Sequence, residues 1–488
     1  MTVLKKTAQI FFSHFLVVIQ GLVFTPLILR VAGVETFGQY SLFSSYLGII
    51  FGVSSFGVGV TARRWLPGAD NLVERARLYY PQFWFQFISI IIICITLYAV
   101  VFGVFGTTQS FLLGVSSATV FIYLIALTLY SQSVDYFRFT HRIKIFSIAT
   151  VIQPYLILLL VIACLYLNIR LNIQSIFTII TLSAIFVGAI LFAKIILELG
   201  IQFQLPKIVT LRTEIALGFP IMLSFLVDAI LIGGDRYVIA YLLSIRDVGI
   251  YVPAYVLGSL MLLVPKVFGV VLPPLLGKNL DVGNKNAVKL MMDQSAKFFL
   301  LLAIPYAFGA ILHGKEILAL YANVEVSEEG WMVVPIVAFA SIFYGLTLLK
   351  SNIFYLRLST KELFQVNLVC VVLNILLNII FIKLFGNIIV SALATLISYY
   401  FSYLFVCNKL HKDKLYFNLD NNFIVIILIY SALMFLFLFF YKKIFDPQKF
   451  YEVMLSIILS VILYTILIVS NKGIRIEFRR VISELKVI

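Results

Sequence analysis

Charged side chains are scarce in this chain of 488 residues: Asp, Glu, Lys and Arg together make up only 12% of it. Soluble globular proteins carry about 25% charged residues, so the composition excludes an ordinary soluble protein of this length. Cysteine and histidine are equally scarce, with four of each and no CxxC or Cys/His ligand spacing. The sequence therefore offers no disulfide framework and no metal motif, and we expect neither a metal site nor a cofactor.

Apolar residues are correspondingly abundant and make up 62% of the chain. A bilayer core about 30 Å thick requires roughly 20 apolar residues per helix, and the runs lack the period-2 alternation of barrel strands. We therefore predict an all-α integral membrane protein with about 14 transmembrane helices. The predicted spans are 9–30, 40–61, 82–105, 110–131, 145–167, 172–193, 213–234, 248–275, 296–313, 332–349, 363–382, 387–408, 422–441 and 453–470.

Lys and Arg are distributed unequally between alternate loops. With the N-terminus inside, 27 of the 37 Lys and Arg fall on the cytoplasmic side. Cytoplasmic loops of membrane proteins carry such an excess, so we predict that both termini are cytoplasmic. The net charge of +15 is then explained by these loops and by contact with anionic lipids, without a nucleic-acid partner.

The chain contains an internal repeat. Gly38 and Tyr40 open the second predicted span, and Gly249 and Tyr251 open the eighth, at the same offset of 211 residues. Six spans thus repeat as six spans in the same orientation, which predicts two bundles related by a pseudo-twofold axis along the membrane normal. The expected organisation is a first bundle over 1–200, a second over 201–412, and two extra helices with a basic tail over 413–488.

Several short motifs follow one another in a characteristic order. They are Gly33-Val-Glu-Thr-Phe-Gly38-Gln-Tyr40, Gly218-Phe-Pro220, Asp235-Arg236-Tyr237, Val248-Gly249-Ile-Tyr251, Asn374-Ile-Leu-Leu-Asn378 and Ser391-Ala-Leu-Ala394-Thr395. In this order they resemble the O-antigen and polysaccharide flippases (Wzx-like) of the MATE-like multidrug/oligosaccharidyl-lipid/polysaccharide exporter superfamily. The resemblance covers about residues 8–410.

The resemblance implies a function. Members of this family move an undecaprenyl-diphosphate-linked oligosaccharide, for O-antigen, capsule or exopolysaccharide, from the inner to the outer leaflet of the bacterial plasma membrane by alternating access. It implies a transporter rather than an enzyme, coupling to protons or sodium, and a polysaccharide polymerase and chain-length regulator as partners. The diphosphate head must cross a low-dielectric slab, so charges inside the spans mark candidate sites.

Cations are the candidates for binding the diphosphate. Lys266 lies within the span 248–275, where it either faces the cavity or reaches back to the cytoplasmic interface. Arg30 ends the first span and is either at the cavity mouth or an interfacial anchor. Arg63 and Arg64 close the second span on the inside, where they either meet the substrate head or only set the topology.

Coupling or gating is expected of four residues. Asp228 is the one acid deep within a predicted span, and it either carries the coupling proton or cation or is a hydrogen-bonded packing residue. Asp235 and Arg236 are predicted at the outer interface, as a gate or as a solvated helix end. Pro265 frees a backbone carbonyl and is expected to bend its helix.

Three other functions fit parts of the sequence. A lipid II-type flippase differs mainly in the head group, and a cation-coupled multidrug exporter of the same superfamily would favour acidic cavity residues. A membrane polysaccharide polymerase or glycosyltransferase is an alternative of a different class. It would require a larger outside loop than the acidic segment 314–331, whose carboxylates form no acid/base motif.

Overall fold

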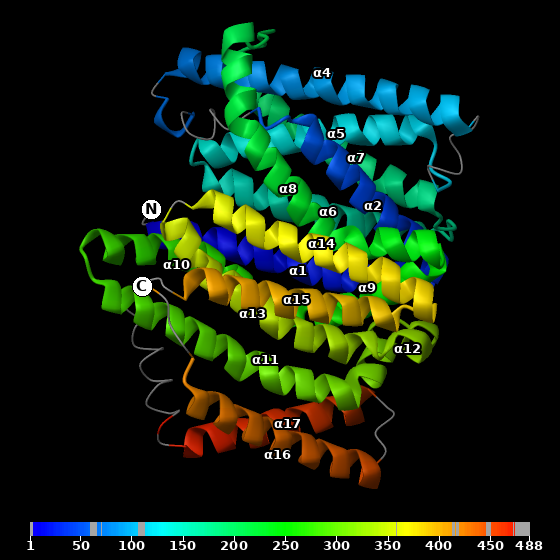
Figure 1. Ribbon diagram of the computed structural model, residues 1–488. Helices are drawn as coiled ribbons and strands as arrows, with labels where there is room; N and C mark the ends of the chain where they lie inside the picture. The colour runs from blue at the N-terminus through cyan, green and yellow to red at the C-terminus, as the bar shows by residue number, and fades with distance from the viewer. Residues whose placement is uncertain are drawn as a thin grey trace. The chain divides into compact units, whose positions relative to one another are not determined.

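A computed structural model describes residues 3–58, 66–69, 71–105, 113–357, 359–411, 415, 419–445, 450–471 and 473. The chain divides into two compact units, Met1–Gly233 and Gly234–Ile488, and the division falls inside one helix. Every regular element among the described residues of both units is a helix, as the composition predicts (Figure 1).

The first unit is built from long helices that follow the predicted spans. Helices α5 and α7 pack side by side, and α6 packs on both α7 and α1. Its helices are α1 (Val3–Ala32), α2 (Val34–Ser54), η1 (Leu66–Gly68), α4 (Leu72–Phe105), α5 (Ser117–Phe139), α6 (Ile143–Tyr166), α7 (Ile173–Leu199) and most of α8 (Ile208–Leu242).

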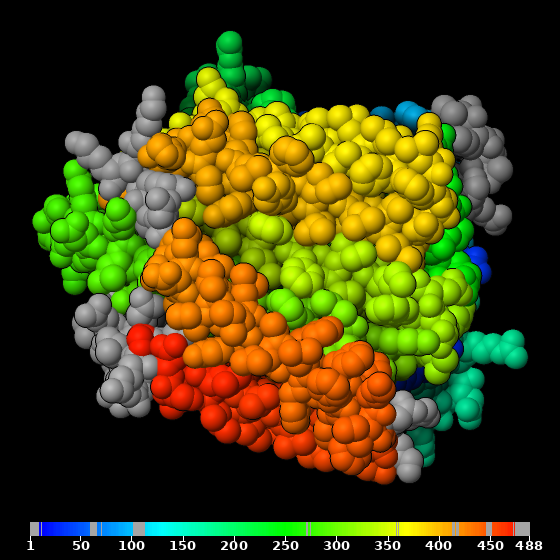
Figure 2. Space-filling model, turned by 60° about the horizontal axis from the view of Figure 1, so that its bottom comes forward, coloured from blue at the N-terminus to red at the C-terminus, as the bar shows by residue number. Residues whose placement is uncertain are grey.

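The second unit is centred on α13, which packs against α11, α15, α9 and α10. Figure 2 shows a face of this unit, with α16 and α17 beside α11. The helices after α8 are α9 (Ile245–Gly258), η2 (Leu260–Leu262), α10 (Leu263–Asp281), α11 (Lys285–Tyr321), α12 (Val324–Gly330), α13 (Val333–Leu356), α14 (Thr360–Phe385), α15 (Ile389–Leu410), α16 (Asn421–Phe445) and α17 (Phe450–Ser470).

Twelve of the described helices are long and apolar enough to cross a membrane. A thirteenth span results if the bent pair Ile245–Gly258 and Leu260–Gly269 counts as one. Helix α2 overlaps the predicted span 40–61 but is not among these candidates, because Glu35, Gln39 and four serines interrupt its apolar residues. The prediction of about fourteen spans thus holds for twelve single helices and the bent pair.

Local capping explains where many helices begin and end. Asn172 starts α7 with a capping box, in which its side chain accepts from the Ser175 amide and Ser175 returns a hydrogen bond. This arrangement satisfies amide groups that have no partner within the helix. Gly386 ends α14 in the left-handed conformation at φ 65°, which glycine adopts without strain.

One motif glycine allows two segments of the first unit to touch. A Cβ built on Gly218 of α8 would lie 2.1 Å from the Gly57 carbonyl oxygen, just beyond α2. Any side chain at Gly218 would therefore push these backbones apart. This explains the glycine of the Gly218-Phe-Pro220 motif.

The extra helices α16 and α17 are attached to α11 by polar contacts as well as by apolar ones. The buried His313 ring shares a hydrogen bond of 2.9 Å with the Ser456 hydroxyl, and the Lys442 ammonium donates to Glu316. The Tyr464 hydroxyl donates to the Leu301 carbonyl at 3.1 Å. These bonds fix the register of the pair against α11.

An arginine ties α9 to the short helix α12 at one end of the second unit. Arg246 forms ion pairs with Glu325 at 2.7 Å and with Glu329 at 2.6 Å. The hydrogen bonds from Arg246 hold the pKa of Glu329 below its ordinary value. The acidic segment expected to be a plain loop is thus a helix that is held by charge.

A carboxylate joins three helices of the first unit. Glu198 near the end of α7 accepts two hydrogen bonds of 2.5 Å from Arg142, and Arg75 of α4 approaches it to 3.5 Å. The Glu198 side chain is 15% exposed, so the pair is partly shielded from water. Arg75 and Arg142 therefore have a structural role beyond the topological one expected from their loops.

We predict that Glu198→Gln lowers the free energy of unfolding by about 1–2 kcal/mol, because the forked pairing with Arg142 is lost. Unfolding of the purified protein by denaturing detergent measures the change. Arg138→Gln is the matched control: Arg138 is 58% exposed and lies 3.9 Å from Asp135, so it should cost less than about 0.5 kcal/mol. Equal effects of the two changes would contradict the role of Glu198.

Candidate functional site

The second unit contains a buried carboxylate, that of Asp235 on α8, which is only 7% exposed. Three side chains from three other helices donate to it. The Tyr251 hydroxyl of α9 and the Thr395 hydroxyl of α15 reach one oxygen at 2.6 and 3.0 Å. The Asn378 amide of α14 reaches the other oxygen at 3.0 Å. Four helices thus meet at one acid, and we call Asp235 with these three residues the Asp235 cluster.

The helix ends explain why these four residues meet. Asp235 and Asn378 each lie seven residues before the last residue of their helices, Leu242 and Phe385. Tyr251 and Thr395 each lie six residues after the first residue of theirs, Ile245 and Ile389. At 1.5 Å per residue all four are about 10 Å from the same end of the bundle.

A second set of hydrogen bonds supports the cluster. Ser391 donates to the Asn378 side-chain oxygen, while the Asn374 amide donates to the Thr395 hydroxyl at 3.2 Å. Asn374 and Asn378 are four residues apart on α14, and Ser391 and Thr395 are four apart on α15, so each pair shares a helix face. The two asparagines thus connect α14 to α15 and to α8.

Tyrosines continue the polar path along the same helices. The Tyr255 hydroxyl, one turn after Tyr251, lies 3.0 Å from the Tyr399 hydroxyl, and the ring of Tyr399 stacks on Tyr344 at 4.5 Å. Arg236 is half-buried next to Asp235, close enough to interact electrostatically with Tyr251 and Tyr255. The charge of Asp235 is therefore flanked by hydroxyl groups and a guanidinium.

The donor set of this cluster defines its chemistry. The carboxylate and the two hydroxyl groups offer hard oxygen atoms, which suit a proton or a hard monovalent cation better than a soft transition metal, while the Asn378 amide only donates. Within the described part of the chain, no three His, Cys, Asp or Glu residues gather as metal ligands. The cluster can exchange a proton or cation against the hydrogen bonds that now satisfy Asp235.

The two candidate acids on α8 differ in burial. Asp235 was expected at an interface, but α8 continues to Leu242 and Asp235 is buried. The predicted end at residue 234 was wrong because the apolar pattern resumes after Arg236. Asp228 lies well inside the candidate span Ile208–Leu242, where it was predicted, but its side chain is exposed and it belongs to the first unit.

Lys266 lies in the first turn of α10 and is exposed, whereas Pro265 beside it is buried. The predicted continuous span 248–275 is broken by a bend of 51° at Ser259. Pro265 follows this bend in the first turn of the next helix, where proline is tolerated, so the expected kink lies before it. Arg30 is exposed in the last turn of α1, and Arg63 and Arg64 lie outside the described residues.

Tyr251, Asn378 and Thr395 belong to the motifs that carry the family resemblance, but these motifs are far apart in the sequence, which does not link them to Asp235. Part of this cluster could have been found from the sequence, because Asn374 and Asn378 precede the end of one predicted span and Ser391 and Thr395 follow the start of the next, each pair four residues apart. Lys350 directly follows the predicted span 332–349, but it is buried within α13 at 1% exposure. An interfacial position was expected because a long lysine side chain near a span end usually extends its ammonium group to the membrane surface.

Two family descriptions match the chain. Residues 3–280 match the polysaccharide biosynthesis protein family, and residues 251–469 match the lipid II flippase MurJ. Among curated proteins, the probable flippase AglR of Haloferax volcanii is 28% identical over 168 residues. That match spans about a third of each protein, 34% of this chain and 34% of the relative.

Solved structures of transporters share the fold. Lipid II flippase MurJ in an inward closed conformation aligns with a TM-score of 0.68 at 16% identity, covering 94% of this chain and 97% of that one. An inward-facing MATE-family multidrug transporter aligns at 0.63 and 14% identity, covering 80% and 94%. A point mutant of the Vibrio cholerae MATE transporter VcmN aligns at 0.55 and 15%, covering 85% and 99%.

At these identities the structural likeness shows the fold alone, whereas the family match over 3–280 covers more than half of the 488 residues. The chain therefore belongs to the polysaccharide biosynthesis protein family and has the MATE-like fold of the lipid II flippase MurJ.

Proposed function

We propose that the protein is a flippase that carries a polyprenyl-diphosphate-linked oligosaccharide from the inner to the outer leaflet of a bacterial plasma membrane. The observation that carries this proposal is the family match over residues 3–280, on a chain whose candidate spans fill most of its length. Translocation needs no covalent chemistry, so side chains act by binding and by moving charge. Cytoplasmic termini and a bundle organisation of 1–200, 201–412 and 413–488 belong to the same proposal.

The first proposed step is recognition of the diphosphate. Lys266 is exposed in α10 directly after the bend, and an exposed ammonium inside an apolar segment is costly unless it meets water or an anion. Arg30, Arg63 and Arg64 are the further cations proposed for the head group. The glycan and its carrier would then be passed to a polysaccharide polymerase and a chain-length regulator.

The second proposed step is coupling at Asp235. Gly233 and Gly234 immediately precede it, where α8 passes from the first unit to the second. Each glycine lowers helix propensity by about 1 kcal/mol relative to alanine, so this is a favourable position for a hinge. A proton or sodium ion bound at Asp235 would release Tyr251, Asn378 and Thr395 and bias that hinge. Arg236, Asp228 and Pro265 are proposed to support this movement.

A lipid II-type flippase is the second candidate, favoured by the match of residues 251–469 to MurJ. Both candidates would move a substrate on the same kind of lipid carrier from the inner to the outer leaflet, and they differ in the sugar that the carrier holds. The likeness to a MATE-family multidrug transporter, at 14% identity, is a likeness of fold.

We predict that depletion of the protein in its host lowers the outward-facing pool of a lipid-linked oligosaccharide. Labelling the glycan of each leaflet with a membrane-impermeant reagent measures that pool. Accumulation of lipid II on the inner leaflet would instead select the second candidate. If neither pool changes, the flippase proposal fails.

Asp235→Asn should lower export by about tenfold or more, because the amide keeps the size of the side chain but cannot carry the coupling charge. Glycan export in cells with equal protein levels measures this, together with its dependence on pH and sodium, which the change should flatten. Asp228→Asn is the comparison, and its exposed position predicts a smaller effect. If Asp228→Asn has the larger effect, coupling belongs to Asp228.

Lys266→Ala should weaken export by about tenfold, because a hydrogen bond to a charged group contributes about 1.5–3 kcal/mol. Lys266→Arg should retain most of the export. The matched control is Lys278→Ala, which removes an exposed lysine in the last turn of the same helix. Unchanged export by Lys266→Ala at normal protein levels would reduce Lys266 to an interfacial anchor.

A further inference from the structure

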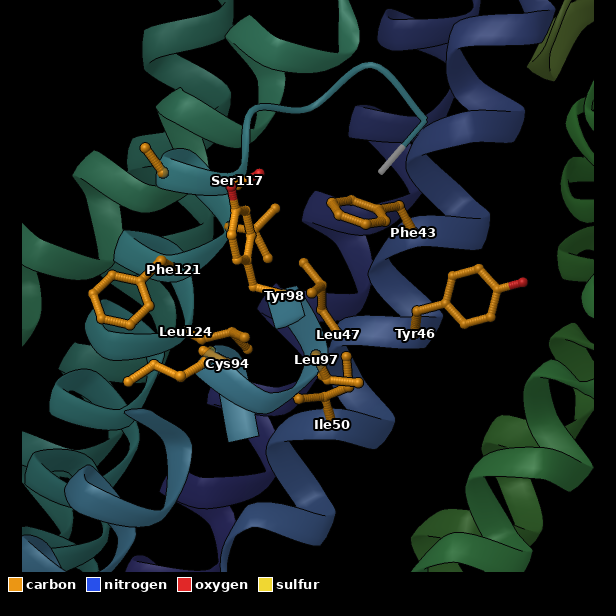
Figure 3. Close-up of a pocket in the computed structure, with 13 residues that line it drawn as sticks. Phe43, Tyr46, Leu47, Ile50, Cys94, Leu97, Tyr98, Ser117, Phe121 and Leu124 are labelled. Carbon is orange, nitrogen blue, oxygen red and sulfur yellow. The ribbon is translucent and has the colours of Figure 1, made fainter. Parts of the chain in front are cut away.

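The first unit contains an apolar cavity of about 300 Å³ between α2, α4 and α5. We call it the α2–α4–α5 pocket. Figure 3 shows that α2 contributes one wall and α5 the opposite wall, with side chains of α4 between them. Its lining includes Phe43 and Leu47 of α2, Cys94, Ile95 and Tyr98 of α4, and Leu124 of α5.

The inner wall of this pocket is buried and apolar. Phe43, Leu47 and Leu124 are buried members of one hydrophobic cluster, and the Phe43 ring packs edge-on against Phe177 at 5.0 Å. A water molecule in a cavity needs two to four polar partners, which such a wall does not supply. The pocket is therefore suited to hydrocarbon.

The outer side of the pocket opens where side chains of α4 are exposed. Ile95 is 61% and Tyr98 is 51% exposed, and both line the pocket. Helix α4 is one of the candidate membrane spans, so these exposed side chains face the lipid. A lipid chain can therefore reach the pocket from the side, within the bilayer.

A polar rim lies next to the pocket, at the first turns of α5 and α7. Gln174 accepts from the Ser116 amide at 2.7 Å and donates to the Thr119 hydroxyl at 2.6 Å, while Ser117 lines the pocket. Polar caps and tyrosines such as Tyr98 favour the boundary between hydrocarbon and head groups. The pocket thus lies just beneath an interface, and the charge distribution of the loops assigns that interface to the outer leaflet.

The dimensions favour a lipid with a single chain. At about 30 Å³ for each water-sized group, the pocket holds about ten carbon atoms of one chain. The two chains of a phospholipid leave the glycerol together, so one of them would stay outside. A polyprenyl chain leaves its diphosphate alone, and its methyl branches can fill a pocket bordered by aromatic rings.

We infer that the α2–α4–α5 pocket binds the isoprenoid units nearest the diphosphate of a polyprenyl-linked substrate, at the outer-leaflet end of the first unit. This inference rests on the proposed flippase function. The pocket would hold the carrier beside the protein while the head group is released.

Cys94 lines the pocket and reports on its occupancy. In the purified full-length protein, polyprenyl phosphate should slow alkylation of Cys94 by N-ethylmaleimide about tenfold, a ratio that corresponds to 1.4 kcal/mol. Cys164 of α6 is also half-buried but does not line the pocket, so its alkylation should not change. Mass spectrometry of the two peptides measures both rates in one sample.

Two variants separate the pocket from the surrounding lipid surface. Ala118→Trp adds a ring to a lining residue and should abolish the protection of Cys94. Ile122→Trp adds the same ring to an exposed position of α5 outside the lining and should leave the protection intact.

Equal protection by dioleoyl phosphatidylglycerol, which carries two chains, would overturn the inference, and so would absence of protection by polyprenyl phosphate. The assay contains no sugar and measures no transport. Normal glycan export without protection would therefore reject the pocket and leave the flippase function standing. Protection of Cys94 without glycan export would support the pocket and reject the flippase function.

Discussion

The cost of burying a carboxylate is the constraint on which the second unit depends. An ionised group in a low-dielectric interior is expensive unless hydrogen bonds satisfy it. Asp235 meets this requirement with donors from α9, α14 and α15, and its own helix α8 is the fourth. The relative register of these four helices is therefore set at one point, and any change in the charge of Asp235 must change their bonding.

This constraint gives the proposed transport cycle a physical basis. Two consecutive glycines precede Asp235, and α9 ends in a 51° bend before α10 begins. Both are places where a long helix can change direction without losing much hydrogen bonding. The buried acid, the glycine pair and the bend thus lie on one continuous stretch of chain. The proposed coupling needs only that ligand exchange at Asp235 shifts the balance between two arrangements of this stretch.

Hydrophobicity alone predicted most of the helices, because in a bilayer each span must satisfy its backbone within a continuous apolar run. It could not show that α2 is too polar to qualify, or that the run 248–275 is two helices. Side-chain burial was predicted less well. Asp235 and Lys350 looked interfacial because charge usually marks a helix end, whereas tertiary hydrogen bonds offset the cost of burying Asp235. Glu198 was missed because its partners Arg142 and Arg75 are distant in sequence.

The central claim is that this chain moves a lipid-linked sugar between leaflets. The direct measurement uses the purified protein in vesicles that contain a fluorescent polyprenyl-diphosphate sugar, with an impermeant reductant added outside that destroys each fluorophore it reaches irreversibly. The account predicts that the fraction destroyed rises from about half toward completion at a rate proportional to the amount of protein. A rate equal to that of protein-free vesicles, with the protein folded and inserted, would contradict it.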